Sequence, residues 1–276
     1  MTYFPSLMIQ IKYFKKLKRF ANINHPKTYN EKNQWMKLHY NTPLMERVAD
    51  KIKLREYLIE KGLEEYSVSL LNIYNNYSEI DFSALPNQFV IKTNHGSGFN
   101  KIILDKSKIN HNELKTLFDY YMKINYFYFN HEKVYKNITP QIIIEPYLGD
   151  IIDYKIMCTN HDILYTVSLK RYSDGHYDEG FYDKDWNHSL GGFNHIKVLD
   201  PKIKPEHKEE MNRIARLISQ DFLQVRVDFY EVNNKVYISE LTFFSESGML
   251  DFKSRDVDVG LGKQFKLPCE QDYEYN

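Results

Sequence analysis

Apolar and polar residues alternate in the stretch 222–244, FLQVRVDFYEVNNKVYISELTFF, and predict two β-strands that meet at Asn233 and Asn234. The odd positions are expected to form the core face: Val225, Val227, Phe229, Tyr237, Leu241 and Phe243. The even positions are polar: Arg226, Asp228, Glu240 and Thr242. A two-residue turn pairs Asp228 with Ser239, whereas a three-residue loop or a β-bulge pairs it with Glu240. We predict one of the latter two arrangements.

A second pattern, FVIKTNHGSGFNKIIL at residues 89–104, predicts a strand, a glycine loop and another strand. Gly96 and Gly98 flank Ser97, and residues without a Cβ let backbone N–H groups approach phosphate oxygens. Lys92 ends the first strand, where its ammonium can meet a phosphate. The alternative is a plain hairpin with a solvated lysine. No helical pattern follows Gly98, which argues against the Walker and dinucleotide-binding fingerprints.

Helical spacing predicts helices over residues 4–20, from Thr28, and over 50–61, 112–129 and 205–220. The apolar positions of the first helix are Phe4, Leu7, Met8, Ile11, Phe14 and Leu17. Basic residues and no acid separate them, so the helix either lies on an anionic membrane surface or packs on its own domain.

Three further strands are predicted in the middle of the chain. QIIIEPYL at residues 141–148 is apolar on both faces, which makes Glu145 conspicuous. DYKIMC and DILYTVSLKRY, residues 153–172, form a hairpin in which Lys155 projects from the polar face. The long polar segment after it contains FYDKDWN, in which Tyr182 and Trp186 suit either sugar recognition or an ordered surface loop.

Composition narrows the class of protein. The 276 residues carry 37 basic and 37 acidic side chains. The chain therefore lacks the net positive charge that would indicate a nucleic-acid partner. Aromatic residues make up 15%, which excludes general disorder, and the two cysteines are typical of a cytosolic protein. With no apparent membrane span or signal peptide, we expect a cytoplasmic protein, with residues 4–20 as the candidate contact with the inner membrane surface.

The two acids of the last hairpin indicate a metal site. Facing carboxylates repel each other unless a cation lies between them, and hard oxygen ligands such as Asp228 and Glu240 suit Mg²⁺ that carries nucleotide phosphates. The alternative is two exposed acids on an edge hairpin.

Several motifs, in order, resemble the TupA-like ATP-grasp family: DKIKLREYL, LPNQFVIKTNHGSGFN, EPYL, DYKI, FYDKDWN, VRVDFYEV, ELTFF and LGKQFKLP. The similarity runs from about Thr28 to Pro268. It implies an α+β ATP-grasp fold, in which two α+β subdomains clasp ATP, preceded by a helical segment. The implied parts are residues 1–49 (helical segment), 50–86 (first α/β portion), 87–148 (lid with the glycine loop) and 149–276 (core with the metal hairpin).

The resemblance also implies roles in nucleotide binding. Lys92 matches the lysine that binds the nucleotide phosphates, and the loop after it is the one that closes on them. Glu145 and Tyr147 fall on the hinge segment that holds adenine. The residues implied in binding ATP are Lys92, His95, Gly96, Ser97, Gly98, Glu145, Tyr147 and Asp153.

The metal and catalytic roles follow in the same way. Asp228 and Glu240 match the metal carboxylates, and Thr242 occupies the place of the asparagine that usually completes the site. Arg55 stands where many ATP-grasp ligases have a second phosphate-binding lysine, so the charge is kept and the geometry altered. The implied catalytic residues are Arg226, Lys155 and Arg55.

The function implied is that of an ATP- and Mg²⁺-dependent carboxylate–amine ligase that forms an acyl phosphate. Because the family is associated with bacterial surface polysaccharides, including teichuronopeptide synthesis, the expected substrates are an amino acid and a uronic acid or a second amino acid. The alternatives are a glycosyltransferase of capsule or O-antigen synthesis and a noncatalytic ATP-binding scaffold. The scaffold is suggested by Thr242 and by the basic first helix.

Overall fold

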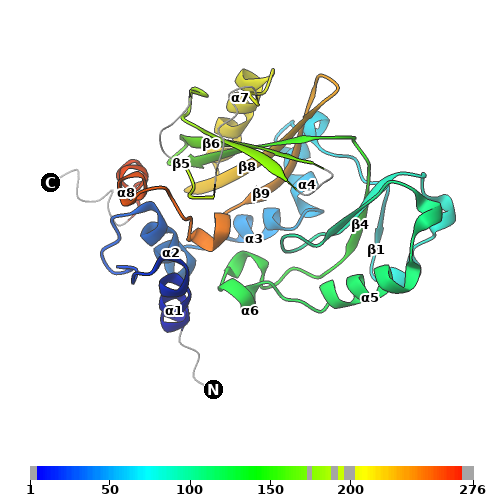
Figure 1. Cartoon of the computed structure of the whole chain (residues 1–276), viewed down its shortest axis with the longest axis horizontal. Helices are drawn as coiled ribbons and strands as arrows, with labels where there is room; N and C mark the ends of the chain where they lie inside the picture. Colours follow the sequence, from blue (N-terminus) through cyan, green and yellow to red (C-terminus); the bar gives the residue numbers. More distant parts are fainter. Residues whose placement is uncertain (1–4, 173–175, 188–191, 196–202, 269–276) are drawn as a thin grey trace. The chain divides into compact units, whose positions relative to one another are not determined.

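The structure is a computed structural model that describes residues 5–172, 176–187, 192–195 and 203–268, and these residues form two antiparallel sheets with α-helices (Figure 1). The four-stranded sheet has the order β1-β4-β2-β3, and the five-stranded sheet has the order β7-β6-β5-β8-β9. The chain divides into two compact units. Unit 1 comprises residues 1–41 and 151–276, and unit 2 comprises residues 42–150.

Each unit contains one sheet. In unit 1 the elements are α1 (Pro5–Leu17), α2 (Tyr29–His39), β5 (Ile152–Thr159), β6 (Asp162–Arg171), β7 (Tyr177–Tyr182), α7 (Lys208–Ser219), β8 (Gln224–Val232), β9 (Lys235–Thr242), the 3-10 helix η6 (Ser245–Gly248) and α8 (Arg255–Gln264). In unit 2 they are α3 (Pro43–Ala49), α4 (Lys53–Glu60), β1 (Asn72–Tyr74), β2 (Phe89–Thr93), β3 (Asn100–Ile103), α5 (His111–Tyr121), α6 (Phe127–Asn130) and β4 (Ile142–Pro146), with 3-10 helices at Glu64–Tyr66, Tyr77–Glu79, Phe82–Ala84, Lys106–Lys108 and Lys133–Tyr135.

The boundaries of the two units do not coincide with those of the four segments expected from the sequence. Most of the segment 1–49 belongs with residues 151–276, whereas the segments 50–86 and 87–148 share unit 2. The physical reason is the packing of α2 against α8, which joins the start of the chain to its end.

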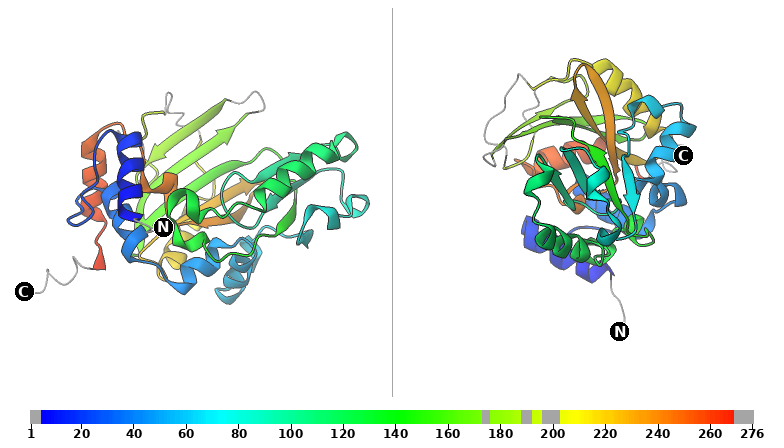
Figure 2. Two further views of the ribbon diagram at one scale, coloured as in Figure 1. Left: turned by 90° about the horizontal axis from the view of Figure 1, so that it is seen from below. Right: turned by 90° about the vertical axis from the view of Figure 1, so that its right-hand side faces the viewer.

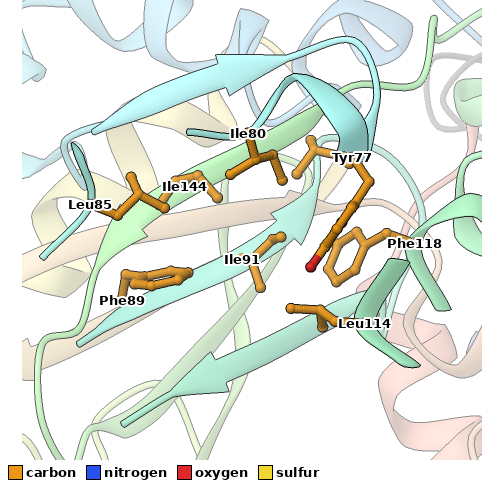
Figure 3. Close-up of a cluster of buried hydrophobic side chains, with 9 residues drawn as sticks. Tyr77, Ile80, Leu85, Phe89, Ile91, Leu114, Phe118 and Ile144 are labelled. Atoms are coloured by element: carbon orange, nitrogen blue, oxygen red, sulfur yellow. The ribbon is translucent and has the colours of Figure 1, made fainter. Parts of the chain in front are cut away.

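Unit 2 has an apolar core on one face of its sheet (Figure 3). Phe89 and Ile91 of β2 and Ile144 of β4 alternate onto this face and meet Leu114 and Phe118 of α5. The opposite face of β4 is also buried, as the run of three isoleucines predicts. The helix expected over 112–129 is interrupted, because α5 ends at Tyr121 and the short α6 begins only at Phe127.

In unit 1, α7 lies along one face of the five-stranded sheet (Figure 2). Its apolar stripe is buried there, and the carbonyl of Ala215 lies 3.8 Å from the thiol of Cys158 on β5. Alternate residues of the strands project from the other face, where the ring of Tyr165 on β6 contacts Tyr29 on α2 at 6.1 Å between centroids. The sheet is therefore covered by α7 and α2.

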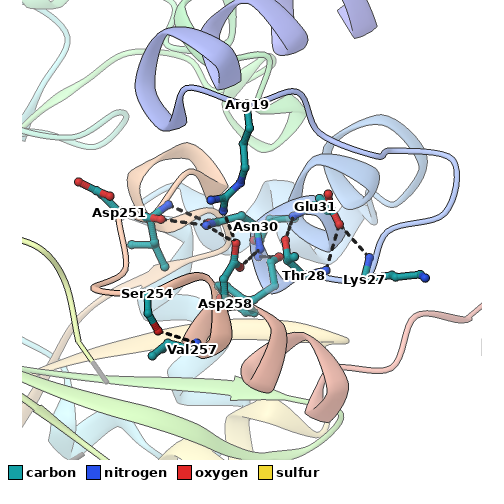
Figure 4. Close-up of polar contacts among 12 residues, drawn as sticks. Arg19, Lys27, Thr28, Asn30, Glu31, Asp251, Ser254, Val257 and Asp258 are labelled. Atoms are coloured by element: carbon teal, nitrogen blue, oxygen red, sulfur yellow. Dashed lines mark hydrogen bonds and ion pairs between the residues drawn. The ribbon is translucent and has the colours of Figure 1, made fainter. Parts of the chain in front are cut away.

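Polar contacts connect α2 to the C-terminal part of unit 1 (Figure 4). Thr28 caps α2 in a capping box with Glu31, which confirms the predicted start of this helix. The backbone N–H of Asn30 donates to Asp258 Oδ1 at 2.9 Å, and its side chain donates to the carbonyl of Leu250 at 2.8 Å. These buried bonds fix α2 beside α8, and a Cβ at Gly262 of α8 would lie 2.3 Å from the carbonyl oxygen of Lys27.

Candidate functional site

The hairpin of β8 and β9 pairs Asp228 with Glu240, as predicted. Asn233 and Asn234 form a two-residue turn with left-handed φ angles of 52° and 58°. A β-bulge between Asp228 and Phe229 then shifts the register, so the bulge and not a longer loop brings the acids opposite each other.

Because of this bulge, one prediction about the core face of β9 is wrong. Between the turn and the bulge the parity of β9 is reversed, so that Val236 and Ile238 are buried. Tyr237, expected in the core, is only half-buried. Beyond the bulge, Leu241 and Phe243 are buried as predicted.

A cation lies between the two acids, and it is the guanidinium of Arg226. Its Nε donates to Asp228 Oδ1 and its Nη2 to Oδ2, both at 2.6 Å, and Nη2 lies 3.6 Å from Glu240 Oε1. Lys155 on β5 places its Nζ 3.5 Å from Asp228 Oδ2. Thr242 accepts from Arg226 at 3.2 Å and donates to Glu240 at 3.3 Å. We call these five residues the Asp228 cluster.

Burial sets the electrostatics of the Asp228 cluster. Asp228 is 3% exposed, which rules out the alternative of two solvated acids. Burial raises the pKa of its carboxyl group, and the charges of Arg226 and Lys155 oppose that shift. Burial by itself would lower the pKa of Arg226, but Asp228 keeps it above its ordinary value. The guanidinium therefore stays charged.

The Asp228 cluster offers the donors that Mg²⁺ prefers. Carboxylate oxygens come from Asp228 and Glu240 and a hydroxyl oxygen from Thr242, and Mg²⁺ in nucleotide sites is commonly held by one or two carboxylates together with phosphates. The described residues contain no group of three or more His, Cys, Asp or Glu side chains that could hold a metal by themselves, and the Asp228 cluster contributes two carboxylates. The donor set thus fits a metal shared with phosphates, provided that Arg226 releases Asp228.

The second cluster lies in unit 2 and is centred on Glu145. Lys92 of β2 and Glu145 of β4 share one face of the sheet, with Lys92 Nζ 2.7 Å from Glu145 Oε2. Arg55 of α4 forms an ion pair with the other oxygen, Oε1. We call these three residues the Glu145 cluster. Both Lys92 and Glu145 are buried, so the lysine is not the solvated side chain of a plain hairpin.

Burial lowers the pKa of Lys92, and Glu145 opposes the shift while Lys51 adds to it. The carboxylate of Glu145 is occupied by two cations. An adenine contact from this residue would therefore have to use its backbone.

The glycine loop adopts a conformation that requires glycine. Gly96 and Gly98 have φ angles of 71° and 76°, and a Cβ at Gly96 would lie 2.8 Å from the ring of Phe99. Ser97 and Gly98 are exposed at the tip. His95 instead points inward and its Nε2 lies 3.1 Å from the carbonyl of Ile124, so its side chain is not exposed to a phosphate.

Lys51 is a cation beside this loop that is not among the site residues predicted from the sequence. Its Nζ donates to the carbonyl of Gly96 at 3.1 Å. The signal that could have singled it out is its place in DKIKLR, one helical turn before Arg55. It is an additional phosphate-binding candidate of unit 2.

The remaining predicted residues contact side chains that belong to neither cluster. Tyr147 in unit 2 donates to Asp150 at 3.5 Å. Asp153 in unit 1 forms an ion pair with Arg171, on the same face of β5 as Lys155. Tyr182 and Trp186 are fully buried, with Trp186 Nε1 donating to Asn212 on α7, so neither ring is available to stack on a sugar.

Taken together, the α+β fold, the glycine hairpin and the acidic hairpin define an ATP-grasp protein. Residues 31–266 match the model of the family described as TupA-like ATP-grasp, and the chain belongs to that family. Both the fold class and the family expected from the sequence are thereby confirmed.

Two solved structures illustrate the similarity. A D-alanine–D-alanine ligase from Bacillus anthracis complexed with ATP has 16% sequence identity and a TM-score of 0.49, over 82% of this chain and 68% of that one. An L-amino acid ligase from Bacillus licheniformis has 12% identity and a TM-score of 0.47, over 79% of this chain and 49% of that one. Both of these proteins are ligases. No curated protein sequence matches the chain.

Proposed function

We propose that the protein is an ATP- and Mg²⁺-dependent carboxylate–amine ligase. The observation that supports this most strongly is the Asp228 cluster, in which a bulge places two carboxylates opposite each other with a cation between them. A buried hairpin that merely stabilised the fold would not need facing acids, because they repel each other. Membership of an ATP-grasp family supports ATP as the partner of these acids.

Each cluster has a chemical role in this proposal. In unit 2, Lys92, Arg55 and the N–H groups of the glycine loop bind nucleotide phosphates, since cations and exposed N–H groups match phosphate oxygens. In unit 1, Asp228 and Glu240 hold Mg²⁺, which offsets phosphate charge when it is bound. Release from Asp228 frees the guanidinium of Arg226 to stabilise negative charge on the reacting carboxylate.

The proposed reaction has two steps. A carboxylate oxygen of the first substrate attacks the γ-phosphorus of ATP, and ADP leaves as the acyl phosphate forms. The amine of the second substrate attacks the acyl carbon, and inorganic phosphate leaves with the amide formed and one proton released. Lys155 and Arg55 stabilise charge on the transferring phosphoryl group. Positioning and charge stabilisation are sufficient, so neither step requires a dedicated general base.

The proposed substrates are an amino acid and a uronic acid, or two amino acids, in the assembly of a bacterial surface polysaccharide. The support is the likeness to a family associated with such polymers. A noncatalytic ATP-binding scaffold is the second candidate. It is favoured by Thr242 in place of the usual asparagine and by the occupation of both Asp228 oxygens by Arg226.

Purified protein incubated with ATP, Mg²⁺, a panel of amino acids and glucuronic or galacturonic acid tests the proposal. We expect ADP release that depends on both substrates, and hydroxylamine should trap the acyl phosphate as a hydroxamate. Release of UDP from UDP-sugars would instead indicate a glycosyltransferase, and ATP binding without turnover would indicate the scaffold.

Two variants locate the activity within the hairpin. Glu240→Gln should remove ADP release because it weakens the metal site. Glu231→Gln is the matched control, since Glu231 also lies on this hairpin but bonds to His207 at 2.6 Å. Equal loss in both variants would refute the assignment of the metal residues.

A further inference from the structure

Helix α1 has two apolar faces, and only one of them is buried. Ile9 and Tyr13 pack into a small core with Ala21, Ile23 and Met249. Most of the apolar positions singled out in the sequence point elsewhere and are exposed: Leu7 (56%), Met8 (42%), Ile11 (40%) and Phe14 (44%). Leu17 is half-buried against the core, and Phe4 lies outside the described residues.

The exposed face continues beyond the end of α1. Phe20 is 68% exposed, and its ring stacks on Phe14 with 4.9 Å between centroids. Lys15 is also exposed and lies near these apolar side chains on the helical wheel, and the exposed Lys18 follows directly after the end of α1. We call this set the α1 face: Leu7, Met8, Ile11, Phe14, Lys15, Lys18 and Phe20.

Neighbouring basic residues attach α1 to the rest of unit 1, and the α1 face remains exposed. Lys16 pairs with Glu246 at 2.8 Å, and Arg19 pairs with the buried Asp258 at 2.7 Å (Figure 4). Together with the burial of Tyr13, these contacts fix the orientation of the helix. The α1 face therefore needs little further ordering before it binds a partner.

We propose that the α1 face docks the protein on an anionic lipid surface. The free energy falls when large apolar side chains such as leucine, methionine, isoleucine and phenylalanine enter the boundary between headgroups and acyl chains. Basic side chains beside them are attracted to anionic headgroups. The proposal is independent of the ligase function.

Charge distinguishes a lipid surface from a second copy of the chain. Residues 5–20 contain five basic residues and no acid; Lys16 and Arg19 pair with acids of unit 1, whereas Lys15 and Lys18 belong to the α1 face. Two such faces in symmetric contact would bring like charges together, which disfavours self-association through this surface. Within the described residues no helix is long and apolar enough to cross a membrane.

The test is co-sedimentation of the full-length protein with vesicles. We expect binding to vesicles of phosphatidylglycerol and phosphatidylcholine, little binding to phosphatidylcholine alone, and weaker binding as salt is raised. Leu7→Ser with Phe14→Ser should reduce the partition coefficient by at least about tenfold, because about half of each large apolar side chain is available for insertion. Lys15→Gln with Lys18→Gln should reduce binding to anionic vesicles only.

A matched control carries Ile59→Ser with Leu217→Ser, two exposed aliphatic side chains on other helices (54% and 40%). It should bind as the wild type does, and near-ultraviolet circular dichroism should show that all variants are folded. Failure of the wild type to bind anionic vesicles, or an equal loss in the control, would overturn the proposal. Sedimentation velocity that shows a dimer abolished by the Leu7 and Phe14 changes, without lipid binding, would assign the surface to self-association.

Discussion

Glu145→Gln should destabilise unit 2, because it leaves the buried ammonium of Lys92 and the half-buried guanidinium of Arg55 without an ionised partner. Lys92 Nζ lies 2.7 Å from the carboxylate, and Arg55 pairs with its other oxygen. Two unit charges at this distance attract by about 6 kcal/mol at an effective dielectric constant of ~20. Desolvation offsets part of this attraction, and removing one member of a buried pair typically costs about 3–5 kcal/mol.

Glutamine retains the shape of Glu145 and one oxygen acceptor, so we expect the lower value, about 3 kcal/mol. For a unit the size of residues 42–150 this corresponds to a Tm lower by roughly 12 °C. Urea denaturation and scanning calorimetry measure the two quantities. Glu60→Gln is the control in the same unit, since Glu60 forms a similar ion pair with Arg47 but is solvent-exposed.

The effect of Glu145→Gln should also depend on pH. Burial lowers the pKa of Lys92 and Glu145 opposes that shift, so the variant should lower the pKa further. A lysine with a lower pKa in the folded state holds fewer protons when folded than when unfolded. The stability of the folded state therefore rises with pH between the two pKa values. The difference in stability between variant and wild type should therefore shrink as the pH rises toward 10.5, the ordinary pKa of lysine.

Equal losses of stability in Glu145→Gln and Glu60→Gln would contradict this prediction, because burial would then not set the cost. Lys92→Met provides a further check. Combined with Glu145→Gln it should cost less than the sum of the two single changes, since the double variant removes opposite charges together. Strict additivity would mean that the two side chains do not interact as their separation indicates.

Three further predictions concern single residues. Asp228→Asn should abolish substrate-dependent ADP release and also lower the Tm, because the buried guanidinium of its cluster loses an ionised partner; wild-type turnover would contradict the metal assignment. Gly96→Ala should lower the free energy of unfolding, measured in urea, more than Gly98→Ala does. Both changes place alanine in a left-handed conformation, which costs about 1–2 kcal/mol, but only at Gly96 would the Cβ meet the ring of Phe99. Burial raises the pKa of the Cys158 thiol to about 12, so in a variant lacking the other cysteine it should react with a thiol reagent only after unfolding.

Local patterns were sufficient to predict the strands of the last hairpin and the pairing of its acids. Alternation identifies which residues share a face, and the repulsion of Asp228 and Glu240 indicates that a cation separates them. The sequence did not distinguish a bulge from a longer loop, because both shift the register by one residue. For that reason the side on which Tyr237 lies could not be predicted.

Contacts between residues far apart in the chain were less accessible from the sequence. Arg55 and Glu145 are 90 residues apart, and nothing local to either residue identifies its partner. The segment containing Trp186 is polar enough to suggest a surface loop, yet α7 covers its ring. In α1, helical spacing predicted the helix but not its buried side, since apolar residues surround much of its circumference.

The construction of unit 1 from both ends of the chain has a consequence for biosynthesis. As the polypeptide leaves the ribosome, residues 42–150 are complete before any strand of the five-stranded sheet has been made. Asp258 follows Asn30 by 228 residues, so the buried hydrogen bonds between them form only after α8 has been made. A chain released before α8 would contain a finished unit 2, but its α2 would lack Asp258, the buried acceptor of the Asn30 hydrogen bonds.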